Sequence, residues 1–302
     1  MDGSANTPPD VQRRLSWLRQ DIEQRLLFRG GRATNVNNVL SAILGLLLTV
    51  AFYAALLPVD GTWFSAVFTE RGYIPYCIVF LTGCSLSILF LKWRKLALQR
   101  RSLELMVVPS NPDFILSPAT VDSVVERIHD VVDEPRQFVL LNRIETALSN
   151  LKNLGQVTEV GEILHSQAEL DESAMETSYL TVTGFVWAVP VLGFIGTVLG
   201  LSAAIGGFGT VLQTSQEMEG LKSALQSVTG GLATAFETTL AGLVAALVVQ
   251  LLVTFLKKSE LEFLDACTDY CSRHVVNKLR LLPFQPEDKS REEPRASQYV
   301  EG

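Results

Sequence analysis

The sequence predicts an all-α membrane protein with four transmembrane helices and long helical extensions in the cytoplasm. Four apolar stretches approach or exceed the roughly 20 residues that a helix needs to cross a bilayer. Basic residues gather at the ends of these stretches, and the charged segments between them keep apolar residues at helical spacing. The four stretches are Val39–Leu57, Tyr73–Leu91, Val182–Phe208 and Leu232–Leu256.

The distribution of Lys and Arg predicts the orientation in the membrane, because short cytoplasmic loops carry an excess of both. Basic residues precede the first span, follow the second and follow the fourth. The two opposite loops, about Pro58–Gly72 and Gly209–Gly231, contain only two basic residues, Arg71 and Lys222. We therefore expect both termini and the long middle segment to lie in the cytoplasm.

The N-terminal segment is expected to be disordered over residues 1–9 and to form an amphipathic helix over residues 10–36. Thr7–Asp10 is typical of a helix start, with proline in the first turn and an acid near the positive end of the dipole. Such a helix would lie either at the membrane surface or against the cytoplasmic part of its own subunit. Its apolar residues recur at helical spacing: Val11, Leu15, Leu18, Ile22 and Leu26.

The rest of the chain divides by composition. Within the cytoplasmic insert we expect helices over about Ser117–Asp133 and Gln137–Leu154, and a third from about Gln156 that enters the membrane at Thr181. Gly206–Gly209 is expected to end the third span. The predicted segments are residues 37–93 with spans one and two, 94–180 as a cytoplasmic helical domain, 181–256 with spans three and four, 257–283 as a cytoplasmic helical extension, and 284–302 as a disordered tail.

Composition and motifs argue against several functions. The net charge is −7 and the basic residues flank the spans, so no nucleic-acid partner is expected. The chain has no G-x-x-x-x-G-K-[ST], G-x-S-x-G or H-E-x-x-H motif, so neither an enzyme nor a bound cofactor is expected. Cys267, Cys271 and His274 share a helical face, but they lack a nearby fourth ligand, and no metal site is expected.

The third and fourth spans carry small and hydroxylated residues where lipid alone would accept plain Leu and Val. Such residues let membrane helices approach closely, as in the small-xxx-small spacing of Gly196 and Gly200. We therefore expect both spans to face other helices. The predicted packing residues are Pro190, Gly193, Gly196, Gly200, Thr234 and Gly242.

Four polar residues near the middle of these spans are candidates for an ion pathway. Thr197 and Thr239 could hand an ion or proton to a neighbouring carboxylate, or could simply hydrogen-bond to their own helix. Glu237, beside a further candidate, Thr238, would cost about 2.5–3.5 kcal/mol if charged in lipid. We expect Glu237 to be protonated, paired or facing water, as an ion-path or gating group or in an interhelical hydrogen bond.

The two spans resemble a known family. The run PVLGFIGTVLG at Pro190–Gly200 is similar to the third-helix signature of the MotA/TolQ/ExbB proton-channel family, and Leu232–Leu243 is similar to its fourth-helix signature. The order of the helices and the large insert also match. By position, Thr197 and Thr239 correspond to the paired channel threonines of the family.

The resemblance implies a homopentamer in the bacterial inner membrane. Its third and fourth helices would surround a dimer of a MotB/TolR/ExbD-like single-span partner, whose transmembrane Asp binds the ion. The ion would be H+, or alternatively Na+, and its flow would drive rotation, with membrane lipid around the complex. The alternative is a non-conducting membrane scaffold or signalling protein, because Leu243–Leu256 lacks the late proline common in the family. A solute transporter fits less well, since no internal repeat is present.

Overall fold

The computed structural model describes residues 15–25, 30–109, 114–154, 157–214 and 218–279. The predicted disordered segments 1–9 and 284–302, and the predicted helix start at Thr7–Asp10, lie outside these residues. The described chain is built of helices, and four of them are long and apolar enough to cross a membrane. The predicted all-α fold with four spans is therefore confirmed.

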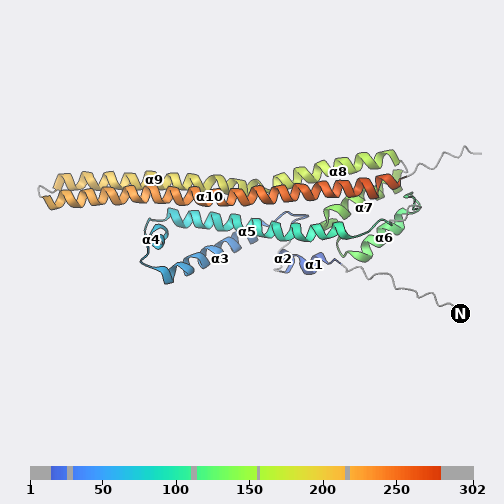
Figure 1. Cartoon of the computed structure of the whole chain (residues 1–302), viewed down its shortest axis with the longest axis horizontal. Coiled ribbons are helices and arrows are strands. Elements are labelled where there is room, and N and C mark those ends of the chain that lie inside the picture. Colours follow the sequence, from blue (N-terminus) through green and yellow to red (C-terminus); the bar gives the residue numbers. More distant parts are fainter. Residues whose placement is uncertain (1–14, 26–29, 110–113, 155–156, 215–217, 280–302) are drawn as a thin grey trace, which may run out of the picture.

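The longest elements form an antiparallel pair, α9 (Leu180–Thr214) and α10 (Met218–His274), which run side by side (Figure 1). Helix α5 (Ile74–Arg100) lies along this pair and packs on both members. Helix α3 (Asn38–Leu56) packs on α5, and the short α4 (Trp63–Thr69) lies between α3 and α5 in the chain. The four spanning helices are therefore α3, α5, α9 and α10.

Helices α3 and α5 touch through glycines. A Cβ added at Gly45 would lie 2.5 Å from Cys84 Sγ, and one at Gly83 would lie 2.9 Å from the Gly45 carbonyl oxygen. Larger residues here would push the two backbones apart. Hydroxyls near this contact donate to carbonyls of their own helix, which satisfies them in apolar surroundings: Thr49, Thr82, Ser85 and Ser87.

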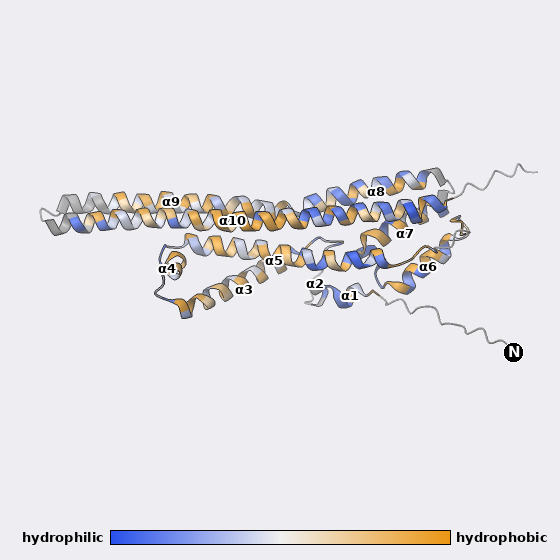
Figure 2. Cartoon of the chain, in the orientation of Figure 1, coloured by the Kyte–Doolittle hydropathy of each residue, from blue (hydrophilic) through white to orange (hydrophobic). Residues whose placement is uncertain are grey.

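The hydrophobic and hydrophilic residues divide the molecule along its length (Figure 2). Hydrophobic residues dominate α3, the first part of α5 and the middle of the α9–α10 pair. Hydrophilic residues gather at the other end, which we call the stalk: α6 (Val121–Val131), α7 (Val139–Leu154), α8 (Val157–Ser178) and α10 from Lys257 onward. The first three lie close to the helices predicted for the insert.

The stalk has its own core, and it continues the spans. Fully buried side chains of α7 and the residue before it fill the centre: Phe138, Leu141, Ile144, Leu148 and Leu151. Helix α8 leads into α9 with a single break at Tyr179, so the third span protrudes from the apolar zone as predicted. Helix α10 passes Lys258 without interruption and runs for 57 residues, which confirms the predicted extension of the fourth span.

Two predicted loops are wrong in detail. The segment Gly209–Gly231 is mostly helical, because α9 continues to Thr214 and α10 begins at Met218, and Gly206–Gly209 lies inside α9 instead of ending it. Glycine costs only about 1 kcal/mol in a helix relative to alanine, and small residues here let the two helices stay paired. The loop Pro58–Gly72 likewise contains a 3-10 turn, Leu57–Val59, and α4.

The single helix predicted over residues 10–36 is also wrong within the described part. Two one-turn helices, α1 (Trp17–Gln20) and α2 (Ile22–Arg25), are separated by Asp21 in an extended conformation. Residues 30–37 are irregular and precede α3. The helical spacing of apolar residues is overridden here by contacts with the stalk. We call residues 15–25 and 30–37 the N-terminal strap.

The strap docks on the chain's own stalk, which was one of the two alternatives left open. The Leu15 amide donates to the Val131 carbonyl at 3.0 Å. Trp17 is buried and meets Phe138 edge-on, with ring centroids 5.3 Å apart. Asp133 accepts from the Ser16 hydroxyl at 2.7 Å and from the Trp17 and Leu18 amides at 2.8 and 3.3 Å.

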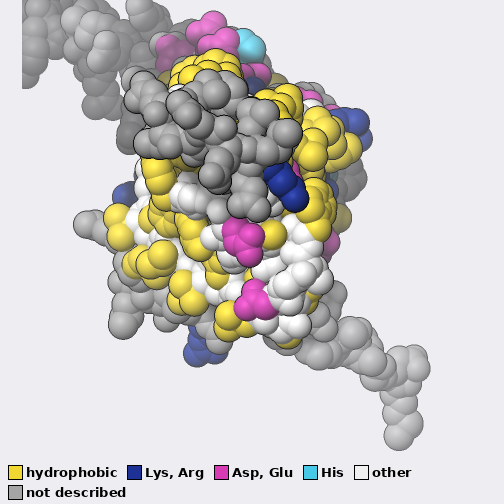
Figure 3. Space-filling view, turned by 90° about the vertical axis from the view of Figure 1, so that its left-hand side faces the viewer, with side chains coloured by type: hydrophobic (Ala, Val, Ile, Leu, Met, Phe, Trp, Pro, Cys, Tyr) yellow, Lys and Arg dark blue, Asp and Glu magenta, His cyan; other side chains and the backbone are white. Residues whose placement is uncertain are grey.

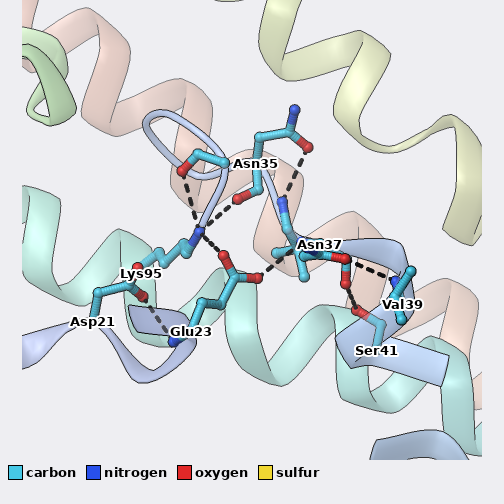
Figure 4. A network of polar contacts seen from close by, with 9 residues as sticks. Asp21, Glu23, Asn35, Asn37, Val39, Ser41 and Lys95 are labelled. Carbon is cyan, nitrogen blue, oxygen red and sulfur yellow. Dashed lines mark hydrogen bonds and ion pairs between the residues drawn. The ribbon is translucent and has the colours of Figure 1, made fainter. Parts of the chain in front are cut away.

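A buried ion pair fixes the strap against α5 (Figure 4). Lys95 Nζ lies 2.6 Å from Glu23 Oε2 and also donates to the Gly31 and Asn35 carbonyl oxygens. The other Glu23 oxygen accepts from the Asn37 amide at 2.9 Å, and the Asn37 side chain in turn caps the start of α3. The pair therefore sets where the first span begins.

A second buried carboxylate, Glu260 on α10, joins four parts of the chain. It accepts from the Thr34 hydroxyl of the strap, from Lys92 Nζ of α5 at 3.4 Å and from the Tyr179 hydroxyl at 2.7 Å. Tyr179 marks the break between α8 and α9. Because removing one partner of a buried pair leaves an uncompensated charge, these contacts hold the strap, α5, α8–α9 and α10 in one arrangement.

Asp133 offers a test of strap docking. Burial alone would raise the pKa of Asp133, but hydrogen bonds from Ser16, Trp17, Leu18 and Glu134 hold it below the ordinary value. Its stabilising effect is therefore complete above the ordinary aspartate pKa and is lost as the pH falls through the lowered one. We expect Asp133→Asn to reduce protection of the Trp17 and Leu18 amides in hydrogen exchange at neutral pH.

The matched control is Glu134→Gln, whose side chain is exposed and adjacent. Equal protection in the Asp133 and Glu134 variants would contradict a docking role for Asp133.

Candidate functional site: the α9–α10 pair

The site begins with a close approach of two backbones. A Cβ added at Gly193 would lie 3.1 Å from Thr239 Cα, and one at Gly196 would lie 2.5 Å from Thr238 Oγ1. A Cβ at Gly242 would lie 3.0 Å from the Val189 carbonyl oxygen. Since real Cβ atoms almost never come so near, a side chain at Gly196 would force α9 and α10 apart.

The contact extends toward the turn between the helices. A Cβ at Gly200 would lie 2.9 Å from the Gly231 carbonyl oxygen, and one at Gly231 would lie 2.6 Å from Ala204 Cβ. Ala235 and Ala246 are buried on the same stripe of α10. Gly231, Ala235 and Ala246 were not among the predicted packing residues, although small residues at steps of four and eleven are the sequence signal for this stripe.

The hydroxyls of Thr238 and Thr239 on α10 both donate to backbone carbonyls. Thr239 Oγ1 donates across the helix contact to the Gly193 carbonyl at 3.0 Å and also lies 3.2 Å from the Ala235 carbonyl of its own helix. Thr238 is buried and donates within its helix to the Thr234 and Ala235 carbonyls. Thr239 therefore links the two helices directly.

Thr197 and Thr239 lie on the same side of the pair. Gly196 faces α5, where its Cβ would lie 3.4 Å from Ile74, and Leu192 packs on the cluster that Ile74 forms with Val189. At 100° per residue, Thr197 lies about 140° around α9 from Leu192. On α10, Glu237 is turned toward the α4–α5 segment and Thr239 lies about 160° from it.

We call this side the threonine face: Thr183, Pro190 and Thr197 of α9 with Thr239, Leu243 and Gln250 of α10. Pro190 lies inside α9 and is half-buried. Proline removes one backbone hydrogen bond from the helix. Thr197 is half-buried, and its hydroxyl donates to the Phe194 carbonyl at 2.6 Å.

Glu237 is paired, which was one of its three expected states. Its Oε2 lies 2.6 Å from Arg71 Nε, and its Oε1 accepts from Trp63 Nε1 at 3.2 Å. The same guanidinium donates to Thr234 Oγ1 at 3.3 Å, which places Thr234, a predicted packing residue, beside Arg71. Glu237 therefore forms an ion pair with Arg71 and an interhelical hydrogen bond with Trp63 of α4.

Neither Arg71 nor Trp63 was predicted as a partner of Glu237. The signal was present, because Arg71 is the only basic residue of Pro58–Gly72 and Glu237 is the only acidic residue of Leu232–Leu256. Charges at membrane depth pair with one another in membrane proteins. The side chains of Arg71 and Glu237 keep 23% and 15% of their surface exposed.

Beside this ion pair lies an apolar cavity of about 450 Å³ between α3, α4, α5 and α10. Its lining is hydrophobic and aromatic apart from Glu237 and Thr82 and includes Phe52, Phe64, Phe68 and Ile78. Figure 3 looks at the end of the molecule that carries α4 and shows mainly hydrophobic and uncharged side chains among the described residues. The Arg71–Glu237 pair thus borders an apolar cavity.

Cys267 and Cys271 belong to the stalk core and not to this site. Both thiols are buried, and burial raises the pKa of Cys267 to about 12 and that of Cys271 to about 11. The His274 ring lies 4.6 Å from the Tyr270 ring, centroid to centroid. At neutral pH the two thiols are therefore protonated packing groups.

Four spanning helices, two of them in close contact through glycines, define a multi-pass membrane protein. The model of the MotA/TolQ/ExbB proton channel family matches residues 133–266, which include α7, α8, α9 and the apolar part of α10. This match supports the resemblance of the third and fourth spans to the family, and the family implies a membrane protein of the proton-channel type. Comparisons with curated proteins and with solved structures gave no match.

The Arg71–Glu237 pair yields a stability prediction. We expect Arg71→Met to lower thermal stability in detergent more than Glu237→Gln does, because it leaves a charged carboxylate in an apolar region. The double variant should recover part of the loss, with a coupling free energy of about 0.5–3 kcal/mol between contacting residues. Strictly additive melting shifts in this double-mutant cycle would contradict a direct interaction.

Proposed function

We propose that this protein is the outer-ring subunit of an ion-driven membrane motor. Five copies would surround two copies of a MotB/TolR/ExbD-like single-span partner in the bacterial inner membrane. A transmembrane Asp of the partner would carry the ion, and ion flow would drive rotation or another mechanical change. No reaction is catalysed, since the energy comes from the ion gradient.

The observation that carries this proposal is the threonine face. In a chain that matches this family, Thr197 and Thr239 come from different helices and lie on the one side of the α9–α10 pair that is turned away from α5. A hydroxyl can accept and donate a proton in apolar surroundings at far lower cost than a charge. The face is therefore suited to surround a partner's carboxylate while it is protonated and deprotonated.

Exposed apolar side chains on α9 and α10 support assembly into a ring. Phe194, Val198, Phe236, Leu243 and Leu247 are each more than half exposed at membrane depth. In a ring, part of this surface would pack on neighbouring copies and part would face the partner's helices. Lipid would cover the remainder on the α3 side.

The ion we propose is H+, with Na+ as the alternative. Hydroxyls and one carboxylate are sufficient for proton transfer, whereas Na+ requires several oxygen ligands around it. The stalk would then pass the mechanical change onward, because α10 joins the membrane and the stalk without a break.

A non-conducting scaffold is the second candidate. It is favoured by the hydroxyls of Thr197 and Thr239, which already bond to the carbonyls of Phe194 and Gly193. A scaffold would use the same glycine contact for packing and would carry no flux.

Native mass spectrometry of the complex, expressed with its genomic neighbours, tests the proposal. We expect five copies of this chain with two copies of a single-span chain that bears a membrane Asp. A monomer or dimer without such a companion would overturn the proposed motor function and support the scaffold function.

Thr239→Val provides the functional counterpart. Valine has nearly the shape of threonine but cannot exchange a proton, so we expect assembly with the partner to persist and partner-dependent proton flux into vesicles to be lost. The control is Thr229→Val, whose hydroxyl also bonds to its own helix and lies elsewhere on α10. Full flux in Thr239→Val would refute the proposed role of this hydroxyl.

A further inference from the structure

A polar groove opens where the α9–α10 pair meets the stalk. It has a volume of about 570 Å³ and lies between the end of α8, the start of α9 and α10. Its polar lining consists of Glu176, Tyr179, Thr183, Gln250, Thr254, Lys257 and Lys258. The two apolar hollows beside α3 are lined very differently, mainly by Leu, Phe and Val.

The groove continues the threonine face. On α9, Thr183, Pro190 and Thr197 follow one another at seven-residue steps, which turn by only about 20° each. On α10, Gln250 and Lys257 lie eleven and eighteen residues after Thr239, within about 20° of its direction. Both walls of the groove therefore lie on the same side of the α9–α10 pair as Thr197 and Thr239, but nearer the stalk.

The distances along the helices are short. At 1.5 Å per residue, Gln250 lies about 16 Å and Lys257 about 27 Å from Thr239 along α10. Leu243 separates Thr239 from Gln250 on this stripe, and polar side chains then follow to the stalk. Gln250 is exposed on the described chain, so its amide faces the groove and not the helix contact.

An ion pair spans the outer end of the groove. Lys257 Nζ lies 3.1 Å from Glu176 Oε1, and the side chains are 39% and 60% exposed. The two charges come from opposite walls, α10 and α8. Tyr179, which also lines the groove, is held in place because its hydroxyl donates to the buried Glu260.

We propose that this groove is the stalk-side mouth of the ion path, and that Glu176 and Lys257 set its electrostatic potential. The inference rests on the proposed function and extends it to residues beyond the family signatures. A cation that leaves the threonine face passes Gln250 and then the ion pair. Lys257 alone would repel it, and Glu176 neutralises that repulsion.

The proposed role of Glu176 and Lys257 can be tested by measuring proton flux in charge variants. In vesicles containing the assembled complex with its partner, Glu176→Gln should lower proton flux about two- to fivefold, the size expected for partly exposed charges. Lys257→Gln should raise it by a similar factor, and the charge-swapped Glu176→Lys/Lys257→Glu double variant should return near wild type. High salt should shrink all these differences.

The matched control is Lys152→Gln, which breaks a somewhat more exposed ion pair with Asp122 between α7 and α6, away from the groove. It should leave flux unchanged. Partner-dependent flux that is identical in all charge variants would overturn this inference and leave the proposed function standing. Absence of flux from the wild-type complex would overturn both.

A second measurement does not depend on flux. Gln250→Cys should react with a membrane-impermeant charged thiol reagent from the stalk side, whereas Val244→Cys, which lines the apolar cavity on the opposite side of α10, should not. Background labelling is measured in the parent chain, where Cys84, Cys267 and Cys271 are buried. Failure of Gln250→Cys to react would show that water does not reach the groove, and would overturn the proposal that the groove is the mouth of the ion path.

Discussion

The contact between α9 and α10 at Gly193, Gly196 and Gly242 determines the rest of the structure. Because no side chains separate the backbones there, the hydroxyl of Thr239 reaches a carbonyl of the other helix. The same contact fixes the rotation of each helix about its axis. It therefore decides that Thr197 and Thr239 share one face, and that Glu237 is turned to the other side, toward Arg71.

Charge is used differently in the two halves of the molecule. At the base of the spans, two buried lysines of α5 bind carboxylates from distant parts of the chain, Glu23 and Glu260, and so fix the strap and the α8–α9 break. Within the apolar zone a single pair, Arg71 with Glu237, joins α10 to the segment before α5. Such pairs contribute mainly by specifying an arrangement, since desolvation offsets much of their attraction.

The amino-acid sequence was sufficient to predict the four spans, the helical insert and the extension of α10, because apolar length and helical spacing are local properties. It also identified four glycines of the helix contact, Gly193, Gly196, Gly200 and Gly242. It did not predict the Arg71–Glu237 pair or the docking of the strap, because both depend on residues far apart in the chain. The strap shows this most clearly. It contacts Asp133 and Phe138, and it forms two short helices where a single regular helix was predicted.

The Arg71–Glu237 pair also has a consequence for synthesis. Arg71 precedes Glu237 by 166 residues, so the ribosome makes the cation long before the acid. When the fourth span leaves the translocation machinery, its carboxylate can pass to a waiting guanidinium instead of entering lipid alone. The order of the two residues thus lets earlier helices guide the insertion of the last one.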